Sequence, residues 1–207
     1  MAIKIPINEI VLKIVSLYLD DYLKRIHLRR IASILKITHR TASLHLNRLE
    51  RLKIFKSRYV GKHKEFYLNL DNILTKFYLV AAENYLALDF LKRNFLVKKI
   101  FLDLTKKLKF EHSVILFGSY AKGEARPESD IDLLVLGELK NKSFVRSIEE
   151  KYDKKIALKT FTPEEFAKAL ERKDFLAVEI LKNHIILRNP EILVSLMWDY
   201  YEKIIKR

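Results

Sequence analysis

Residues 114–123 read VILFGSYAKG and residues 129–136 read SDIDLLVL, and these two segments decide the fold of the chain around them. The first segment opens with four apolar residues, a run of strand length. Gly118 and Ser119 follow this run, where small side chains let the backbone turn. The second segment ends in another apolar run. We therefore predict a strand, a Gly-Ser turn, a short helix, a loop and a second strand.

Asp130 and Asp132 stand two residues apart at the start of the second strand. Side chains at this spacing share one face of a strand, so we expect both carboxylates to face the Gly-Ser turn. Amides at such a turn attract an anion, and Mg²⁺ binds one or two carboxylates together with substrate phosphates. Alone, an Asp-x-Asp pair is often a solvated strand end and a Gly-Ser pair only a turn. Together they predict a cation site suited to nucleotidyl transfer.

The motifs Gly118-Ser119, Ala121-Lys122-Gly123 and Ser129-Asp130-Ile131-Asp132 resemble those of the DNA polymerase beta-like nucleotidyltransferase superfamily. The similarity is to its minimal nucleotidyltransferase (MNT) branch and covers about residues 110–190. It implies a nucleoside triphosphate and Mg²⁺ as cofactors, with Asp130 and Asp132 as the catalytic and metal-binding acids. It also implies a nucleotide site formed by Gly118, Ser119, Lys122 and Ser129. Lys122 and Arg126 could neutralise phosphate charge, and each is equally well explained as a surface cation.

The chain departs from this family in one respect. Relatives carry a third carboxylate on the next strand, which we place at residues 155–160, and this segment contains no acid. By register Ala157 takes the acidic position, Lys159 lies on the same face, and Asp153 precedes the strand. We therefore expect weaker metal binding and weaker activation of an attacking hydroxyl, while triphosphate binding survives.

Positive charge is concentrated in the first third of the chain. The 207 residues contain 40 Lys and Arg against 26 Asp and Glu, a net charge of +14. Residues 1–70 contain 15 basic and 5 acidic side chains, residues 71–110 contain 8 and 4, and residues 111–207 contain 17 of each. A basic module joined to a charge-balanced one indicates nucleic-acid binding by the first part.

Composition excludes several classes of protein. The chain has no cysteine, hence no disulfide or thiolate zinc site. The beginning of the sequence shows no signal-peptide pattern, and the apolar residues 73–91 include Lys76, Glu83, Asn84 and Asp89, which excludes a membrane span. We expect a cytoplasmic protein. Absent Cys and Gln with abundant Lys, Glu and Ile favour a thermophilic or archaeal source.

Residues 8–70 resemble a winged helix-turn-helix domain. Apolar spacing predicts helices at 8–24, 28–35 (Ile31, Ile34 and Leu35 inward) and 38–52 (Ala42, Leu46 and Leu49 inward). Strands at 54–59 and 65–70 would enclose a basic turn at 60–64. The resemblance implies a double-stranded DNA partner, with the third helix in the major groove. The candidate DNA-binding residues are His39, Arg40, Thr41, Ser43, Asn47, Arg48, Arg58, Lys62 and Lys64. A solvated basic face or a protein-docking module would explain the same pattern.

Residues 71–109 contain neither Gly nor Pro and show helical periodicity, which predicts one long helix or two with a bend, capped by Asp71. Their apolar surface would be buried either in a homodimer or by packing between the two domains. Further helices are expected at 141–152, 163–172, 174–182 and 190–205, with a short strand at 184–187. His184 and Trp198 are interpreted as packing residues.

We thus predict an α+β protein with a winged helix at 1–70, a helical connector at 71–109 and an MNT-like domain with a small mixed sheet at 110–207. The expected function is a DNA-binding transcription regulator whose second domain binds NTP and Mg²⁺ with weak or no catalysis. The alternative is an active enzyme that transfers a nucleoside monophosphate from ATP to a protein or small hydroxyl. The resemblance to the MNT branch implies this alternative, because MNT-type antitoxins modify HEPN-type partner proteins in this way. A third possibility is a fold kept only as a dimerisation scaffold.

Overall fold

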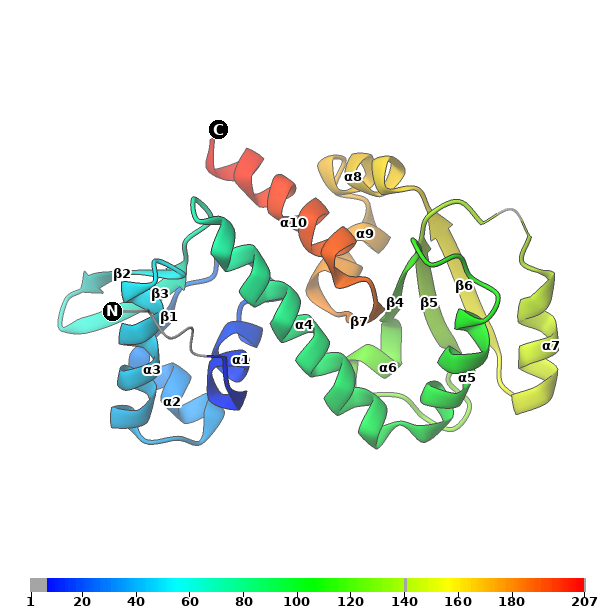
Figure 1. Cartoon of the computed structure of the whole chain (residues 1–207), viewed down its shortest axis with the longest axis horizontal. Coiled ribbons are helices and arrows are strands. Elements are labelled where there is room, and N and C mark those ends of the chain that lie inside the picture. Colours follow the sequence, from blue (N-terminus) through cyan, green and yellow to red (C-terminus); the bar gives the residue numbers. More distant parts are fainter. Residues whose placement is uncertain (1–6, 140, 207) are drawn as a thin grey trace. The chain divides into compact units, whose positions relative to one another are not determined.

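The computed structural model describes residues 7–139 and 141–206 and divides the chain into two units (Figure 1). Unit 1 comprises Met1–Ala82 and Tyr201–Arg207, and unit 2 comprises Glu83–Tyr200. The first six residues of the predicted first domain, residue 140 and residue 207 lie outside the described residues. The described residues form helices, a three-stranded sheet and a four-stranded sheet, which confirms the predicted α+β class.

Unit 1 contains three short helices and an antiparallel sheet. The elements are α1 (Glu9–Ser16), β1 (Ile26–His27), α2 (Leu28–Leu35), α3 (His39–Arg51), β2 (Phe55–Val60) and β3 (His63–Leu68). The strands pair in the order β1-β3-β2. Thr38 caps α3, because its hydroxyl accepts a hydrogen bond from the Thr41 amide at 3.1 Å. Ala42, Leu46 and Leu49 are buried, as predicted.

The predicted first helix is too long. It ends at Ser16 rather than near residue 24, and the chain continues through turns that bury Tyr18 and Leu19. Tyr18 donates a hydrogen bond to the Phe66 carbonyl at 2.9 Å, which ties this segment to β3. Farther on, the Asp21 carboxylate accepts the Leu23 amide at 2.9 Å, a local bond that competes with helix formation.

Two other predictions for unit 1 are corrected. Ile34 on α2 is 43% exposed instead of facing inward, and Ala32 is buried in its place. The hairpin turn consists of Gly61 and Lys62 alone, since Val60 already pairs with His63. Gly61 has φ +58°, a conformation that glycine adopts without strain and that permits this tighter turn. The two-residue strand β1 was not expected from the sequence.

The predicted connector consists of two helices, α4 (Ile73–Arg93) and α5 (Phe95–Thr105). They are separated at Asn94, whose side-chain amide donates to the Phe90 carbonyl at 2.9 Å. The chain therefore bends there, as one of the two predicted forms requires. The predicted cap of this segment was Asp71, but the side-chain hydrogen bond at the N-terminus of α4 comes from Asn72. Asn72 Oδ1 accepts the Leu74 amide at 3.1 Å. Asp71 instead forms an ion pair with Lys56.

Unit 2 is built on a mixed sheet in the order β6-β5-β4-β7. The strands are β4 (Ser113–Phe117), β5 (Ile131–Leu136), β6 (Ile156–Phe161) and β7 (Ile185–Arg188). β4 runs antiparallel to both β5 and β7, whereas β5 and β6 are parallel. A parallel pair needs a crossover connection, and α7 (Ser143–Tyr152) provides it. The one-turn helix α6 (Gly118–Lys122) follows β4 directly, so the predicted strand, turn and helix are confirmed.

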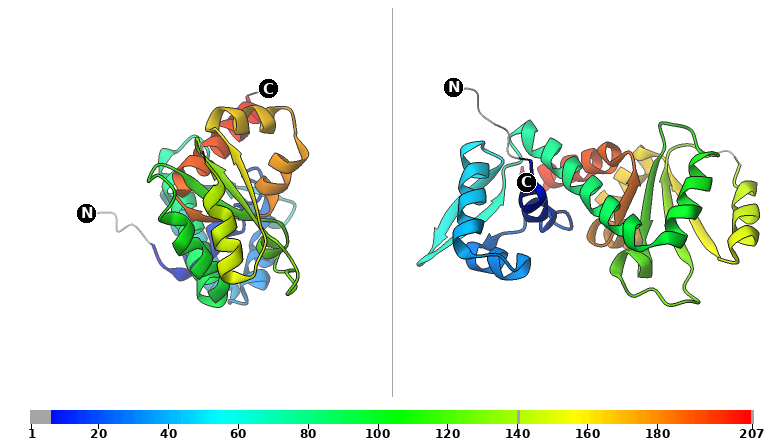
Figure 2. Two further views of the ribbon diagram at one scale, coloured as in Figure 1. Left: turned by 90° about the vertical axis from the view of Figure 1, so that its right-hand side faces the viewer. Right: turned by 60° about the horizontal axis from the view of Figure 1, so that its bottom comes forward.

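Helices cover both faces of this sheet (Figure 2). One face, which includes Leu116, Leu133 and Val135, packs against Val97 and Ile100 of α5 and the buried side of α7. The other face carries Ile115, Asp132 and Leu134 by strand alternation and lies on the side of α8 (Pro163–Glu171), α9 (Phe175–Lys182) and α10 (Pro190–Ile205). The predicted cap of α8 is confirmed as a capping box between Thr162 and Glu165.

Several helices end without glycine. At these ends Lys36, Lys53, Asp153 and Lys173 have φ between +47° and +57°, in the left-handed region that favours glycine. Lys36 and Asp153 are the C-caps of α2 and α7. Lys53, which follows the C-cap of α3, also adopts the left-handed conformation. The scarcity of glycine has therefore not prevented the helix ends from forming.

A buried ion pair joins two distant segments of unit 2. Glu83 Oε1 lies 2.9 Å from His184 Nε2, and the two side chains are 0% and 3% exposed. His184 Nδ1 also donates to the Ile180 carbonyl at 2.7 Å. Burial alone would lower the pKa of His184, but the negative charge and hydrogen bond of Glu83 outweigh it and raise the pKa. His184 is thus a packing residue, as predicted, held by a specific acid.

The helices of residues 7–139 and 141–206 include none with the length and apolarity that a membrane crossing requires.

We predict that Glu83→Gln destabilises the protein by on the order of 3 kcal/mol at pH 6, because the buried imidazolium loses its counter-ion. A raised histidine pKa stabilises the fold fully below the unfolded value of about 6.5, and this contribution is lost as the pH rises through the folded pKa. The unfolding free energy of the wild type, measured in urea, should therefore fall over that range. The fall should be absent in Glu83→Gln and unchanged in the control Glu164→Gln, at an exposed position on α8. Equal pH slopes in all three proteins would contradict the role of this pair.

Candidate functional site

The turn after β4 packs directly against the carboxylate of Asp132. Phe117 pairs with Asp132 across the antiparallel β4–β5 ladder, so the next residue, Gly118, lies beside that side chain. A Cβ atom at Gly118 would lie 2.1 Å from Asp132 Oδ2. Gly118 also has φ +67°, a conformation that disfavours any residue with a side chain. The structure therefore brings together the predicted turn and one of the predicted acids.

Asp132 is half-buried, and Asp130 is exposed just before β5. Burial is the main cause that raises the pKa of Asp132, followed by the negative charges of Asp130 and Glu179. The positive charges of Lys159 and Lys122 act in the opposite direction. The site thus collects like charges at one end of the sheet, and this repulsion favours a bound cation.

Lys122, at the end of α6, forms an ion pair with a residue that the sequence analysis did not select. Its Nζ atom lies 2.6 Å from Glu179 Oε1 on α9, and the two side chains are 33% and 22% exposed. The hydrogen bond and charge of Glu179 raise the pKa of Lys122, with smaller contributions from Glu124 and Asp132. Lys122 is therefore a cation at the site, and its ammonium group is held by Glu179 of α9.

The other predicted nucleotide-site residues differ in their surroundings. Ser119 is half-buried as the second residue of α6. Ser129 closes the loop before β5, because its hydroxyl oxygen accepts the Arg126 amide at 2.9 Å. The Arg126 side chain is exposed in that loop. Ser129 thus serves the loop that carries Asp130, while its hydroxyl hydrogen remains available for another acceptor.

The register of β6 places Ala157 beside Asp132, as the sequence predicted. Lys159 pairs with Leu134, two residues along, and so shares the face of Asp132. Asp153 lies in the turn between α7 and β6, where it ends α7 with φ +47°. β6 therefore contributes a methyl group and a cation, but no carboxylate, to the face that carries Asp132.

Asp130 and Asp132 fit a divalent cation as a partial ligand set. Both are hard oxygen donors, and their mutual repulsion would be relieved by such an ion. Over residues 7–139 and 141–206 there is no group of three or more His, Cys, Asp or Glu side chains arranged for metal binding. A bound Mg²⁺ would therefore take its remaining ligands from phosphate and water, as this ion commonly does.

A cavity adjoins the same helix α6. It has a volume of about 290 Å³ and lies within unit 2, between the second half of α4 and the segment 120–125. Its polar lining comes from Asp89, Arg93, Asn94 and Lys122, and Phe90 and Tyr120 are among its apolar residues. This volume is near the lower limit for small-molecule sites. Because Lys122 borders both the cavity and the acidic site, the two are adjacent.

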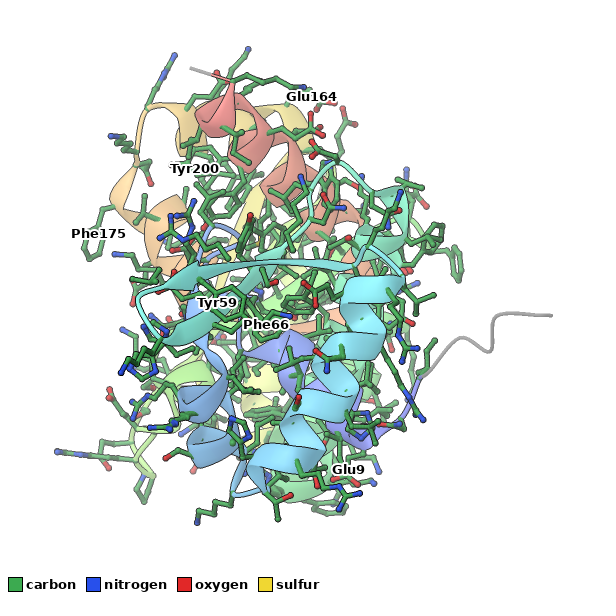
Figure 3. The ribbon with its side chains drawn as sticks, turned by 90° about the vertical axis from the view of Figure 1, so that its left-hand side faces the viewer. Glu9, Tyr59, Phe66, Glu164, Phe175 and Tyr200 are labelled. Carbon is green, nitrogen blue, oxygen red and sulfur yellow. The ribbon has the colours of Figure 1, made fainter. Side chains whose placement is uncertain are left out.

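The candidate DNA-binding residues lie on α3 and the β2–β3 hairpin of unit 1. Figure 3 shows these two elements side by side, with Tyr59 labelled on the hairpin. His39, Arg40, Asn47 and Arg48 are exposed on α3, and Thr41 and Ser43 are half-buried there. The exposed face of α3 is therefore basic and polar over most of its length.

The cations of the hairpin are not equivalent. Arg58 Nε forms a 3.0 Å ion pair with Glu65, and Lys64 Nζ forms a 2.7 Å ion pair with Glu50 at the end of α3. Lys62 is exposed in the two-residue turn. Arg58 therefore links the two strands of the hairpin and Lys64 links the hairpin to α3, while Lys62 is presented at the tip.

Sequence reasoning missed Glu179 and the role of Glu83. Both are single acids in otherwise apolar helical segments, FLAVEILK for α9 and LVAAENYLA in α4. An isolated acid in such a segment is a signal that could have been used, because a buried carboxylate needs a specific partner. The identity of the partner depends on contacts 57 and 101 residues apart.

The sequence model of one protein family, described as nucleotidyltransferase domain, matches residues 88–207, more than half of the chain. Comparison with curated proteins and with solved structures gives no match.

We predict that Gly118→Ala destabilises the protein by about 3 kcal/mol, because it combines left-handed backbone strain with a collision against Asp132. Gly123→Ala is a matched control: Gly123 has φ +74°, but its added Cβ would meet nothing within 4 Å. The control should cost only about 1 kcal/mol of strain. Urea unfolding measures both, and equal losses would show that the contact with Asp132 is not tight.

Proposed function

The chain belongs to the nucleotidyltransferase domain family, and from this premise we propose that it is a DNA-binding transcription regulator that senses a nucleoside triphosphate. In this proposal unit 2 binds the nucleotide with Mg²⁺ and transfers it weakly or not at all. Unit 1 binds double-stranded DNA as a winged helix. The observation that carries the proposal is the position of Ala157 beside Asp132, in a site that otherwise keeps the family's turn and paired acids.

Nucleotide binding is supported by the contact between Gly118 and Asp132. The backbone of the turn can approach a phosphate group closely, because Gly118 has no side chain there. Asp130 and Asp132 would hold Mg²⁺, which neutralises phosphate charge when bound. Lys122 is a cation beside Asp132 and would neutralise charge on the phosphates. These groups need no acid on β6 to bind a triphosphate.

Weak catalysis follows from what β6 lacks. Transfer requires that an acceptor hydroxyl be activated, and a positioned general base contributes about 10²- to 10⁴-fold to such a step. Ala157 cannot accept a proton, and Lys159 brings a positive charge to the same face. A site that binds nucleotide without completing the reaction is suited to sensing.

DNA binding is supported by the element order of unit 1 and by its charge. The order α1, β1, α2, α3, β2, β3 resembles that of winged helix domains, and α3 exposes His39, Arg40, Asn47 and Arg48. Side chains of these types contact base edges and phosphates in the major groove. Lys62, at the tip of the hairpin, would contact the backbone or the minor groove.

A homodimer remains part of the proposal. Ile73, Leu74 and Phe77 at the start of α4 are 61%, 45% and 66% exposed. A second copy that covered these side chains would present two α3 helices together, as many DNA-binding dimers do.

The second candidate function is an active nucleotidyltransferase. It would transfer a nucleoside monophosphate from ATP to a protein or small-molecule hydroxyl, as MNT-type antitoxins do with HEPN-type partners. The retained pair Asp130 and Asp132, of which Asp132 packs against the Gly118 turn, favours this candidate. The adjoining cavity would then accommodate part of a substrate.

We predict that Asp132→Asn weakens Mg²⁺-dependent ATP binding at least tenfold, because it removes a charged ligand worth about 1.5–3 kcal/mol. Isothermal titration calorimetry with ATP and Mg²⁺ measures this. Asp153→Asn, which changes an exposed acid on the adjoining turn, should leave the affinity unchanged. Undetectable binding by the wild type would refute the nucleotide half of the proposal. Incubation with labelled ATP and lysate separates the two functions, since label transfer abolished by Asp132→Asn supports the enzyme.

We predict that Arg40→Ala lowers affinity for target DNA fragments by about tenfold, whereas Arg172→Ala in unit 2 has no effect. Lys62→Ala should reduce the slope of log affinity against log salt by about 0.9, as expected for one lost phosphate contact. Gel-shift titrations against genomic fragments at several salt concentrations measure both effects. No shift with any fragment, with or without nucleotide, would exclude the DNA half of the proposal.

A further inference from the structure

Glu179 lies on the side of the sheet where Asp132 points, but it comes from a helix rather than a strand. α9 begins at Phe175, capped by the Asp174 carboxylate, which accepts the amides of Leu176 and Ala177 at 2.9 and 3.3 Å. Buried Ala177, Ile180 and Leu181 fix the rotation of this helix. Glu179 is therefore held in place by the packing of α9, with its side chain 22% exposed.

Three acids, Asp130, Asp132 and Glu179, lie near one another at this end of the sheet, together with Lys122 and Lys159. Glu179 and Asp130 are both close enough to Asp132 for their negative charges to act on it. Lys122 interacts with Asp132 as well as with Glu179, to which it is bonded at 2.6 Å. Lys122 is therefore the group through which Glu179 and the Asp-x-Asp pair are connected.

We propose that Glu179 is a positioning residue of the nucleotide site, where it fixes Lys122 next to the phosphate-binding turn and supplies the third negative charge that β6 lacks. The proposal rests on the proposed nucleotide binding of unit 2. Glu179 acts through Lys122 and is not a third metal ligand, in keeping with the absence of a three-residue metal cluster from the described parts of unit 2. Because it approaches from α9, it leaves the position of Ala157 unoccupied by an acid. Glu179 therefore gives the cation site a third nearby negative charge, but β6 still lacks a general base.

The alternative is that the Lys122–Glu179 ion pair has a purely structural role and only holds α6 against α9. The two explanations differ in what happens to a cation. If the ion pair only holds the two helices together, replacing either partner weakens that contact but does not change Mn²⁺ affinity at a fixed nucleotide concentration. A positioning charge influences Mn²⁺ affinity even when the hydrogen bond to Lys122 is preserved.

The test measures Mn²⁺ binding by electron paramagnetic resonance, with the whole 207-residue chain and a non-hydrolysable ATP analogue. Glu179→Gln can still accept a hydrogen bond from Lys122 but carries no charge, and it should weaken Mn²⁺ binding about threefold to tenfold. Glu179→Asp keeps the charge and should stay within about twofold of the wild type. Glu164→Gln, an exposed acid on α8, is the control for a general loss of negative charge. Thermal unfolding of each variant verifies that it folds.

Wild-type Mn²⁺ affinity in Glu179→Gln would overturn the proposal. So would equal weakening in Glu179→Asp and Glu179→Gln, because charge would then not be the cause. The variant Asp132→Asn separates this inference from the function on which it rests. If Asp132→Asn abolishes Mn²⁺ binding while Glu179→Gln does not change it, nucleotide binding stands and the role of Glu179 falls. If the wild type binds neither Mn²⁺ nor the analogue, the proposed function fails and this inference fails with it.

Discussion

The contact between the Gly118 backbone and the Asp132 carboxylate is the constraint on which unit 2 depends. Any side chain at Gly118 would occupy the space of Asp132 Oδ2, so the turn and the acid can be neighbours only because one of them has no Cβ. The antiparallel register of Phe117 with Asp132 fixes this contact. β4 and β5 are the two central strands of the sheet, and the buried helices on either face hold them in that register.

Much of this arrangement could be predicted because its determinants are local. Strand, glycine turn, short helix and strand follow one another within residues 114–136, and alternation along β5 assigns Asp132 to one face. The absence of an acid on β6 and the register of Ala157 also follow from a short segment. The capping box of α8 is equally local, since the bonds that form it join residues three positions apart.

What could not be predicted depends on contacts between distant segments. Nothing around Lys122 indicates that α9 places Glu179 against it, and nothing around Glu83 indicates His184. The early end of α1 is similar, because the turn after Ser16 is stabilised by the bond from Tyr18 to β3, 48 residues away. Ile34 shows the limit of periodicity: the pattern marks an apolar stripe on α2, but the neighbouring elements decide which part of it is covered. The roles of the site residues stay predictions until ligand binding is measured.

The helix ends described above have a consequence for the unfolded chain. Lysine or aspartate in the left-handed region costs about 1 kcal/mol of strain relative to glycine. Glycine would avoid that strain but would give the denatured chain more conformations to lose on folding. With only four glycines in 207 residues, the protein accepts strain in the native state in exchange for a stiffer disordered state. The stabilisation that comes from a less flexible unfolded chain increases with temperature, because the conformational entropy that opposes folding is multiplied by temperature.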